Sequence, residues 1–148
     1  MSRTAPLTHI SLAIDDIDGA MAFFGKALGF SALFRDDDLT DEVARLASRD
    51  GLRVKITQMS RADDGCVLEL IEFNDNGTVP ASGAGPVPMA HICFAVEDLE
   101  RSLAEMKAAG AVPLGEVVPF PEARSVYLRV PGNAIVEIIQ RYRSGDSM

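Results

Sequence analysis

Histidine and cysteine are scarce in this chain, and their scarcity limits the chemistry that it can carry out. Its 148 residues include only two histidines and two cysteines. Cys66 and Cys93 lie far apart and form no CxxC motif, so neither a zinc knuckle nor a redox pair is indicated. A site built on imidazole must therefore use His9, His91 or both.

Basic charge and long apolar runs are also lacking. Acidic residues outnumber Lys and Arg by 22 to 14, which gives a formal net charge of -8. Such a chain is repelled by nucleic acid and by anionic membranes, so we expect neither as a partner. No apolar run is long enough to cross a bilayer, and the first residues contain no apolar segment of the signal-peptide kind. We therefore expect a soluble, cytoplasmic protein.

Two phrases occur twice in the sequence. HISLAIDDI at 9–17 returns as HICFAVEDL at 91–99, with four of nine positions identical, including the histidine. VLELIE at 67–72 returns as IVEIIQ at 135–140, which aligns Glu69 with Glu137. Each half of the chain thus holds one histidine and one glutamate in an apolar, strand-like run.

The periodicity in each half predicts a strand, a helix and then three strands. Residues 7–14 alternate between two faces, and apolar residues at helical spacing follow from Ile17, after the N-cap candidates Asp15 and Asp16, until Gly29. The second half repeats this, with a helix from Asp98 to Gly110. The remaining strands are expected at 30–35, 42–48 with 53–59, and 66–73 in the first half, and near 112–118, 125–130 and 134–142 in the second.

A Gly-, Pro-, Asn- and Ser-rich stretch separates the two halves. It covers residues 74–88 and has the composition of a linker. The expected organisation is a first module at 1–73, this linker, and a second module with a short tail at 89–148.

The four duplicated side chains suggest one metal site. A carboxylate such as Glu69 or Glu137 in an apolar strand costs several kcal/mol when it is buried without a partner, and metal ligation removes that penalty. Histidine nitrogen and carboxylate oxygen suit zinc, nickel, cobalt, manganese and iron(II). A single histidine or glutamate on a strand is more often structural. Four in duplicated register indicate that His9, Glu69, His91 and Glu137 bind one divalent ion.

On these residues the chain, over roughly 6–142, resembles the vicinal oxygen chelate superfamily. This superfamily includes glyoxalase I, methylmalonyl-CoA epimerase, extradiol dioxygenases and fosfomycin-resistance proteins. The resemblance implies an α+β fold in which two tandem βαβββ modules form a curved mixed sheet around a metal. It implies His9 and Glu69 as ligands from one module, and His91 and Glu137 from the other. It also implies a homodimer, with the site either within one chain or across two.

The resemblance further implies a lyase or isomerase that moves a proton next to a metal-chelated carbonyl of a small oxygenated substrate. Glu137 is then the base, with Glu69 as ligand and catalytic partner. Glu42 is a weaker acid/base candidate, and an exposed strand residue is its simpler interpretation. The segment 117–124 is either a lid, in which Arg124 pairs with a substrate carboxylate, or an ordinary turn.

Departures of this sequence from the patterns of individual family members reduce the number of reactions that it is expected to catalyse. Glyoxalase I holds glutathione through an Arg and an Asn whose places are taken here by Ala13 and Phe73, so an epimerase-like reaction is favoured. Fosfomycin-resistance proteins usually carry histidine at the place of Glu69. An extradiol-type dioxygenase needs a further histidine and is less favoured. The alternative is a non-catalytic small-molecule or drug-binding protein of the bleomycin-resistance kind.

Overall fold

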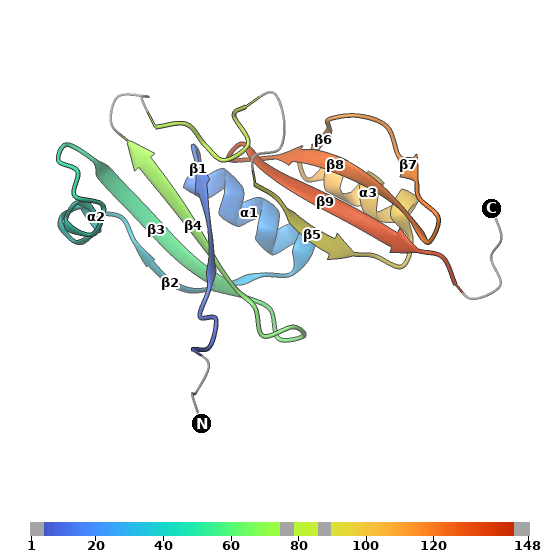
Figure 1. Cartoon of the computed structure of the whole chain (residues 1–148), viewed down its shortest axis with the longest axis horizontal. Helices are drawn as coiled ribbons and strands as arrows, with labels where there is room; N and C mark the ends of the chain where they lie inside the picture. The colour runs from blue at the N-terminus through green and yellow to red at the C-terminus, as the bar shows by residue number, and fades with distance from the viewer. Residues whose placement is uncertain (1–4, 75–78, 86–89, 144–148) are drawn as a thin grey trace.

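The strands of the computed structural model form two sheets that repeat one order. The structure describes residues 5–74, 79–85 and 90–143. Sheet A has the order β1-β4-β3-β2, and sheet B has the order β5-β9-β8-β6, with β7 also paired to β8 (Figure 1). The first half contains β1 Ile10–Ile14, α1 Ile17–Leu28, β2 Ser31–Asp36, α2 Thr40–Ala47, β3 Arg53–Ser60 and β4 Val67–Asn74. The second half contains β5 Ile92–Ala95, α3 Leu99–Ala108, β6 Val112–Pro113, β7 Val118–Pro119, β8 Ala123–Val130 and β9 Ala134–Arg141.

The duplicated helices begin and end where the sequence predicts. The Asp16 carboxylate accepts a hydrogen bond from the Gly19 N–H and caps α1, and Gly29 ends that helix with a φ of 74°. Asp98 caps α3 in the same way, through the Arg101 N–H. No helix in the described part of the chain is long and apolar enough to span a membrane.

Two strand predictions are wrong. Residues 42–48 fall mainly in α2 instead, where Asp41 and Glu42 in the first turn and Arg45 in the last turn suit the helix dipole. The expected strand 112–118 is split into the two-residue strands β6 and β7. Each contains a proline, which has no N–H to donate to a continuous ladder.

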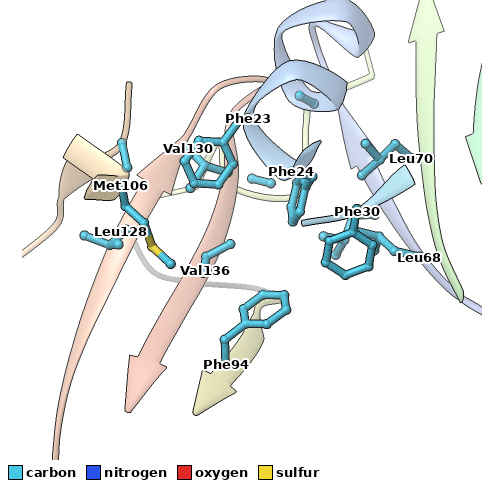
Figure 2. Close-up of a cluster of buried hydrophobic side chains, with 14 of the residues drawn as sticks. Phe23, Phe24, Phe30, Leu68, Leu70, Phe94, Met106, Leu128, Val130 and Val136 are labelled. Carbon is cyan, nitrogen blue, oxygen red and sulfur yellow. The ribbon is translucent and has the colours of Figure 1, made fainter. Parts of the chain in front are cut away.

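Helix α1 lies between the two sheets and joins them in one core (Figures 1 and 2). Phe24 is fully buried, and its ring packs edge-to-face against Phe23 and Phe30. Phe30 in turn meets Phe94 of β5, with ring centroids 6.1 Å apart, and the Arg61 guanidinium lies 5.0 Å from both of these rings. The two modules thus share one interior, and each sheet keeps a second face directed away from it.

The described part of the expected linker forms backbone hydrogen bonds to both modules. The Ser82 N–H donates to the Ala13 carbonyl, and the Gly83 N–H donates to the Asn133 carbonyl. A Cβ on Gly83 would lie 2.3 Å from that Asn133 oxygen, so only glycine allows this approach. The rest of the predicted linker, 75–78 and 86–88, lies outside the described residues.

Candidate metal centre

The first His–Glu pair is formed where β1 runs parallel to β4. His9 directly precedes β1, and the register places Ser11 opposite Glu69. His9 Nε2 lies 3.4 Å from Glu69 Oε2. The same oxygen accepts a hydrogen bond of 2.9 Å from Gln58 Nε2 on β3, and Glu69 is buried. Gln58 therefore holds the carboxylate at a fixed place beside the imidazole.

The second pair repeats this arrangement where β5 runs parallel to β9. His91 directly precedes β5, and His91 Nε2 lies 3.1 Å from Glu137 Oε2. The Ser125 hydroxyl donates to the other oxygen, Glu137 Oε1. The Tyr127 ring packs edge-to-face against the His91 imidazole, with centroids 5.0 Å apart. Both the imidazole and the carboxylate are thus held by neighbours on β8.

Strand alternation explains why these carboxylates stand in apolar runs. Leu68 and Leu70 on β4, like Val136 and Ile138 on β9, are buried in the shared core. Glu69 and Glu137 lie between them and therefore point to the opposite face of each sheet. The imidazoles on this face stay accessible, with 37% of the His9 side chain and 33% of the His91 side chain exposed.

Within one chain the four predicted ligands form two pairs and no larger group. No three His, Cys, Asp or Glu side chains in the described residues gather closely enough to hold a metal. Each pair nevertheless places an imidazole nitrogen beside a carboxylate oxygen, 3.4 Å apart in the first pair and 3.1 Å apart in the second. Two nitrogens and two carboxylate oxygens form a donor set that suits a divalent transition ion, so the residues fit the metal that the sequence predicts.

Sequence reasoning did not find the residues that support these ligands. Gln58 and Tyr127 are the antiparallel cross-strand partners of Glu69 and Glu137. The duplicated phrases do not include β3 or β8, so the repeat carries no signal for them. Strand register is the signal that identifies them.

Two other candidates lie away from the pairs. Glu42 is exposed on α2 instead of on a strand. Arg124 on β8 lies opposite Gln140 on β9 and contacts both the Glu100 carboxylate and Gln140, on the α3 side of sheet B. Glu137 points to the other face, so Arg124 is an internally paired arginine in this chain.

Cys93 is the cross-strand neighbour of Glu137 and has an altered acidity. Burial, together with the charge and hydrogen bonding of Glu137, raises the pKa of the Cys93 thiol from 9.0 to about 11, and Arg141 opposes this shift. The thiol therefore stays protonated at neutral pH.

We expect Cys93 of the metal-free protein to be alkylated slowly in a Cys66→Ser background. A pKa rise from 9.0 to about 11 lowers the thiolate fraction at pH 8 by about 100-fold, and only the thiolate reacts. The iodoacetamide rate should rise with pH towards an inflection near 11, while the urea-unfolded chain inflects near 9. An inflection near 9 in the folded protein would contradict this assignment.

The fold consists of two repeated sheets, each with one His–Glu pair, and comparison with known proteins identifies the family. Residues 8–127 match the family model described as the Glyoxalase/Bleomycin resistance protein/Dioxygenase superfamily. The chain therefore belongs to this superfamily, and the predicted vicinal oxygen chelate fold is confirmed. No curated protein matches the chain in sequence.

Solved structures share this fold at low sequence identity. A glyoxalase family protein from Bacillus cereus is 20% identical, with a TM-score of 0.79, and the match covers 96% of this chain and 97% of that one. The fosfomycin resistance protein FosX from Listeria monocytogenes is 19% identical, with a TM-score of 0.66 and coverage of 95% and 96%. A mutant glyoxalase I from Zea mays is 22% identical, with a TM-score of 0.65 and coverage of 91% and 46%.

Proposed function

We propose that this chain is a metal-dependent, glyoxalase-like lyase or isomerase that moves a proton next to a carbonyl of a small oxygenated substrate. The duplicated His–Glu pair carries the proposal: each histidine Nε2 lies 3.1–3.4 Å from its glutamate, on a face directed away from the core. Membership of the superfamily supports this proposal.

His9, Glu69, His91 and Glu137 are the proposed ligands of one divalent ion. Their two imidazoles and two carboxylates suit Zn, Ni, Co, Mn or Fe(II). A FosX structure from Listeria monocytogenes, 17% identical with a TM-score of 0.61, was solved with Mn(II) and a dihydroxypropylphosphonic acid. This neighbour supports a divalent ion on this fold.

We propose that two copies of the chain complete each site. One chain presents its ligands as separate pairs, and each pair lies at the first two strands of its sheet. β1 and β5 are the terminal strands in the order of their sheets, so each has an outer edge with which no strand of the described chain pairs. A two-fold dimer that places β1 of one copy beside β5 of the other would form two equivalent four-ligand sites.

Glu137 is the proposed base. A divalent ion at this site would polarise a substrate carbonyl and make the neighbouring C–H more acidic. Glu137 then accepts that proton, and the Ser125 hydroxyl bonded to Oε1 orients its carboxylate. Glu69, buried and fixed by Gln58, remains a ligand and is the second carboxylate that can return the proton.

An epimerase-like reaction is favoured over a glutathione-dependent one. Ala13 and Phe73 stand where glyoxalase I holds glutathione, and both pack in an apolar cluster with Ile71. Apolar, packed positions cannot hold the charged ends of a tripeptide.

Elemental analysis and solvent-deuterium exchange test the proposal. Purified protein should contain a stoichiometric first-row ion and catalyse exchange beside the carbonyl of a 2-oxo acid, a thioester or a hemithioacetal. Glu137→Gln should abolish the exchange, whereas Glu105→Gln, an exposed change on α3, should retain it. Full exchange in Glu137→Gln would show that the base is wrong. A metal-free protein that binds small molecules would favour the bleomycin-resistance-like alternative.

A further inference from the structure

The two His–Glu faces differ in what covers the sheet beside them. On sheet A, Ile56 lies two residues along β3 from Gln58, and Ile71 lies two residues along β4 from Glu69, on the same face. Both isoleucines are buried. Leu39 and Val43, at the start of α2, pack against this cluster. The space beside the first pair is therefore filled by protein.

In the part of the chain that the structure describes, no helix covers the matching area of sheet B. Glu137, Ile139 and Arg141 follow one another on this face of β9. Helices α1 and α3 supply side chains to the core on the other face, and α2 packs on β3 of sheet A. The open area therefore extends from the second His–Glu pair to the end of β9.

Apolar side chains gather along one side of this open area. Val118 lies opposite Ser125, which lies opposite Ile139, and Phe120 follows two residues after Val118. Leu114 and Tyr127 lie level with Glu137, and Val112 lies beyond it on the same face. With Val118 and Phe120 these are five of the ten large hydrophobic residues that are exposed in the described chain. Apolar surface concentrated in this way is typical of a binding site.

Positive charge lies at the far end of the area. Arg141 and Arg143 line a surface cavity of about 520 Å³ together with Glu97, which leaves one net positive charge among its side chains. Arg141 forms no hydrogen bond or ion pair with any residue that the structure describes. In contrast, Arg124 is paired with Glu100, and Arg129 is bonded to the Gly83 carbonyl and Asn133. An unpaired arginine is available to a ligand, even though the whole chain has a net charge of -8.

We propose that this open face of sheet B holds the apolar body of the substrate and that Arg141 pairs with a carboxylate at its far end. The substrate class is then an oxygen-chelating monocarboxylate with an aromatic or aliphatic body. That such a monocarboxylate is the substrate rests on the proposed function, because its chelating oxygens must reach the ion that His91 and Glu137 are proposed to bind. The single net positive charge matches a monoanion, and the exposed ring of Phe120 matches an apolar body.

Titration with a pair of probes that differ only in charge tests this assignment. The probes are 4-phenylbutyrate and its neutral analogue 4-phenylbutan-1-ol, followed by amide shifts in ¹⁵N-labelled protein as isolated and after metal removal. The acid should bind about fivefold more tightly than the alcohol, as expected for a solvent-accessible ion pair. Shifts should concentrate on β7, β8 and β9.

Three variants separate the contribution of the Arg141 charge to binding from the contribution of the apolar surface. Arg141→Gln should remove the preference for the acid and leave the alcohol's affinity unchanged. Phe120→Ala should weaken both probes by the same factor. Arg101→Gln, an exposed change on α3, should alter neither.

Equal affinities for the two probes, no binding of either probe, or a preference that survives Arg141→Gln would each overturn the assignment. Because the probes are also titrated into metal-free protein, failure of the carboxylate site can be distinguished from failure of the proposed function. Metal binding without this selectivity rejects only the carboxylate site. Selectivity in a protein that never binds metal rejects the proposed reaction while keeping the site.

Discussion

Two variants that each lack one His–Glu pair are expected to recover metal binding when they are refolded together. The first carries His9→Ala and Glu69→Ala, and the second carries His91→Ala and Glu137→Ala. Alone, each should bind metal at least about 100-fold more weakly than the wild type, because changes that only reorient ligands already cost 10- to 100-fold. In a two-fold dimer with shared sites, a mixed dimer contains one intact site.

The recovered fraction distinguishes the two ways of assembling the site. Random association makes about half of the dimers mixed, so about a quarter of all sites should regain full affinity. Metal titration of the refolded mixture measures this fraction, with refolded wild type as the control for losses during refolding. If each site forms within one chain, the mixture will bind no more metal than the separate variants, and the proposed dimer is wrong.

Phe24→Ala is expected to destabilise the fold by about 3–5 kcal/mol, the range for a fully buried phenylalanine. Phe24 is 0% exposed and lies between Phe23 and Phe30 in the core that joins the two sheets. Total stabilities of about 5–15 kcal/mol are usual, so this loss approaches the threshold of folding. Urea denaturation monitored by circular dichroism measures it.

Leu46→Ala provides the matched control. Leu46 is 86% exposed on α2, so its removal should change the free energy of unfolding by less than about 0.5 kcal/mol. Similar losses in both variants would show that α1 does not hold the two modules together.

The duplicated segments were predictable because local chemistry determines them. The Asp16 cap and the Gly29 end of α1 depend on a few neighbouring backbone groups, and the His–Glu pairing follows from alternation on adjacent parallel strands. Residues 42–48 were predicted as a strand, because the short apolar spacing there suits either structure. Contacts of Val43 with the apolar face of sheet A favour the helix.

The sequence alone determined the two modules, the family and the His–Glu pair in each module. These features follow from repeated residues and from periodicities that act over a few positions. The tertiary structure decided that Gln58 and Ser125 hold the carboxylates and that Arg124 is paired internally. It also decided that helix α2 packs over one histidine face, while none of the described helices covers the other. These depend on strand register and on packing between distant segments, which no local pattern encodes.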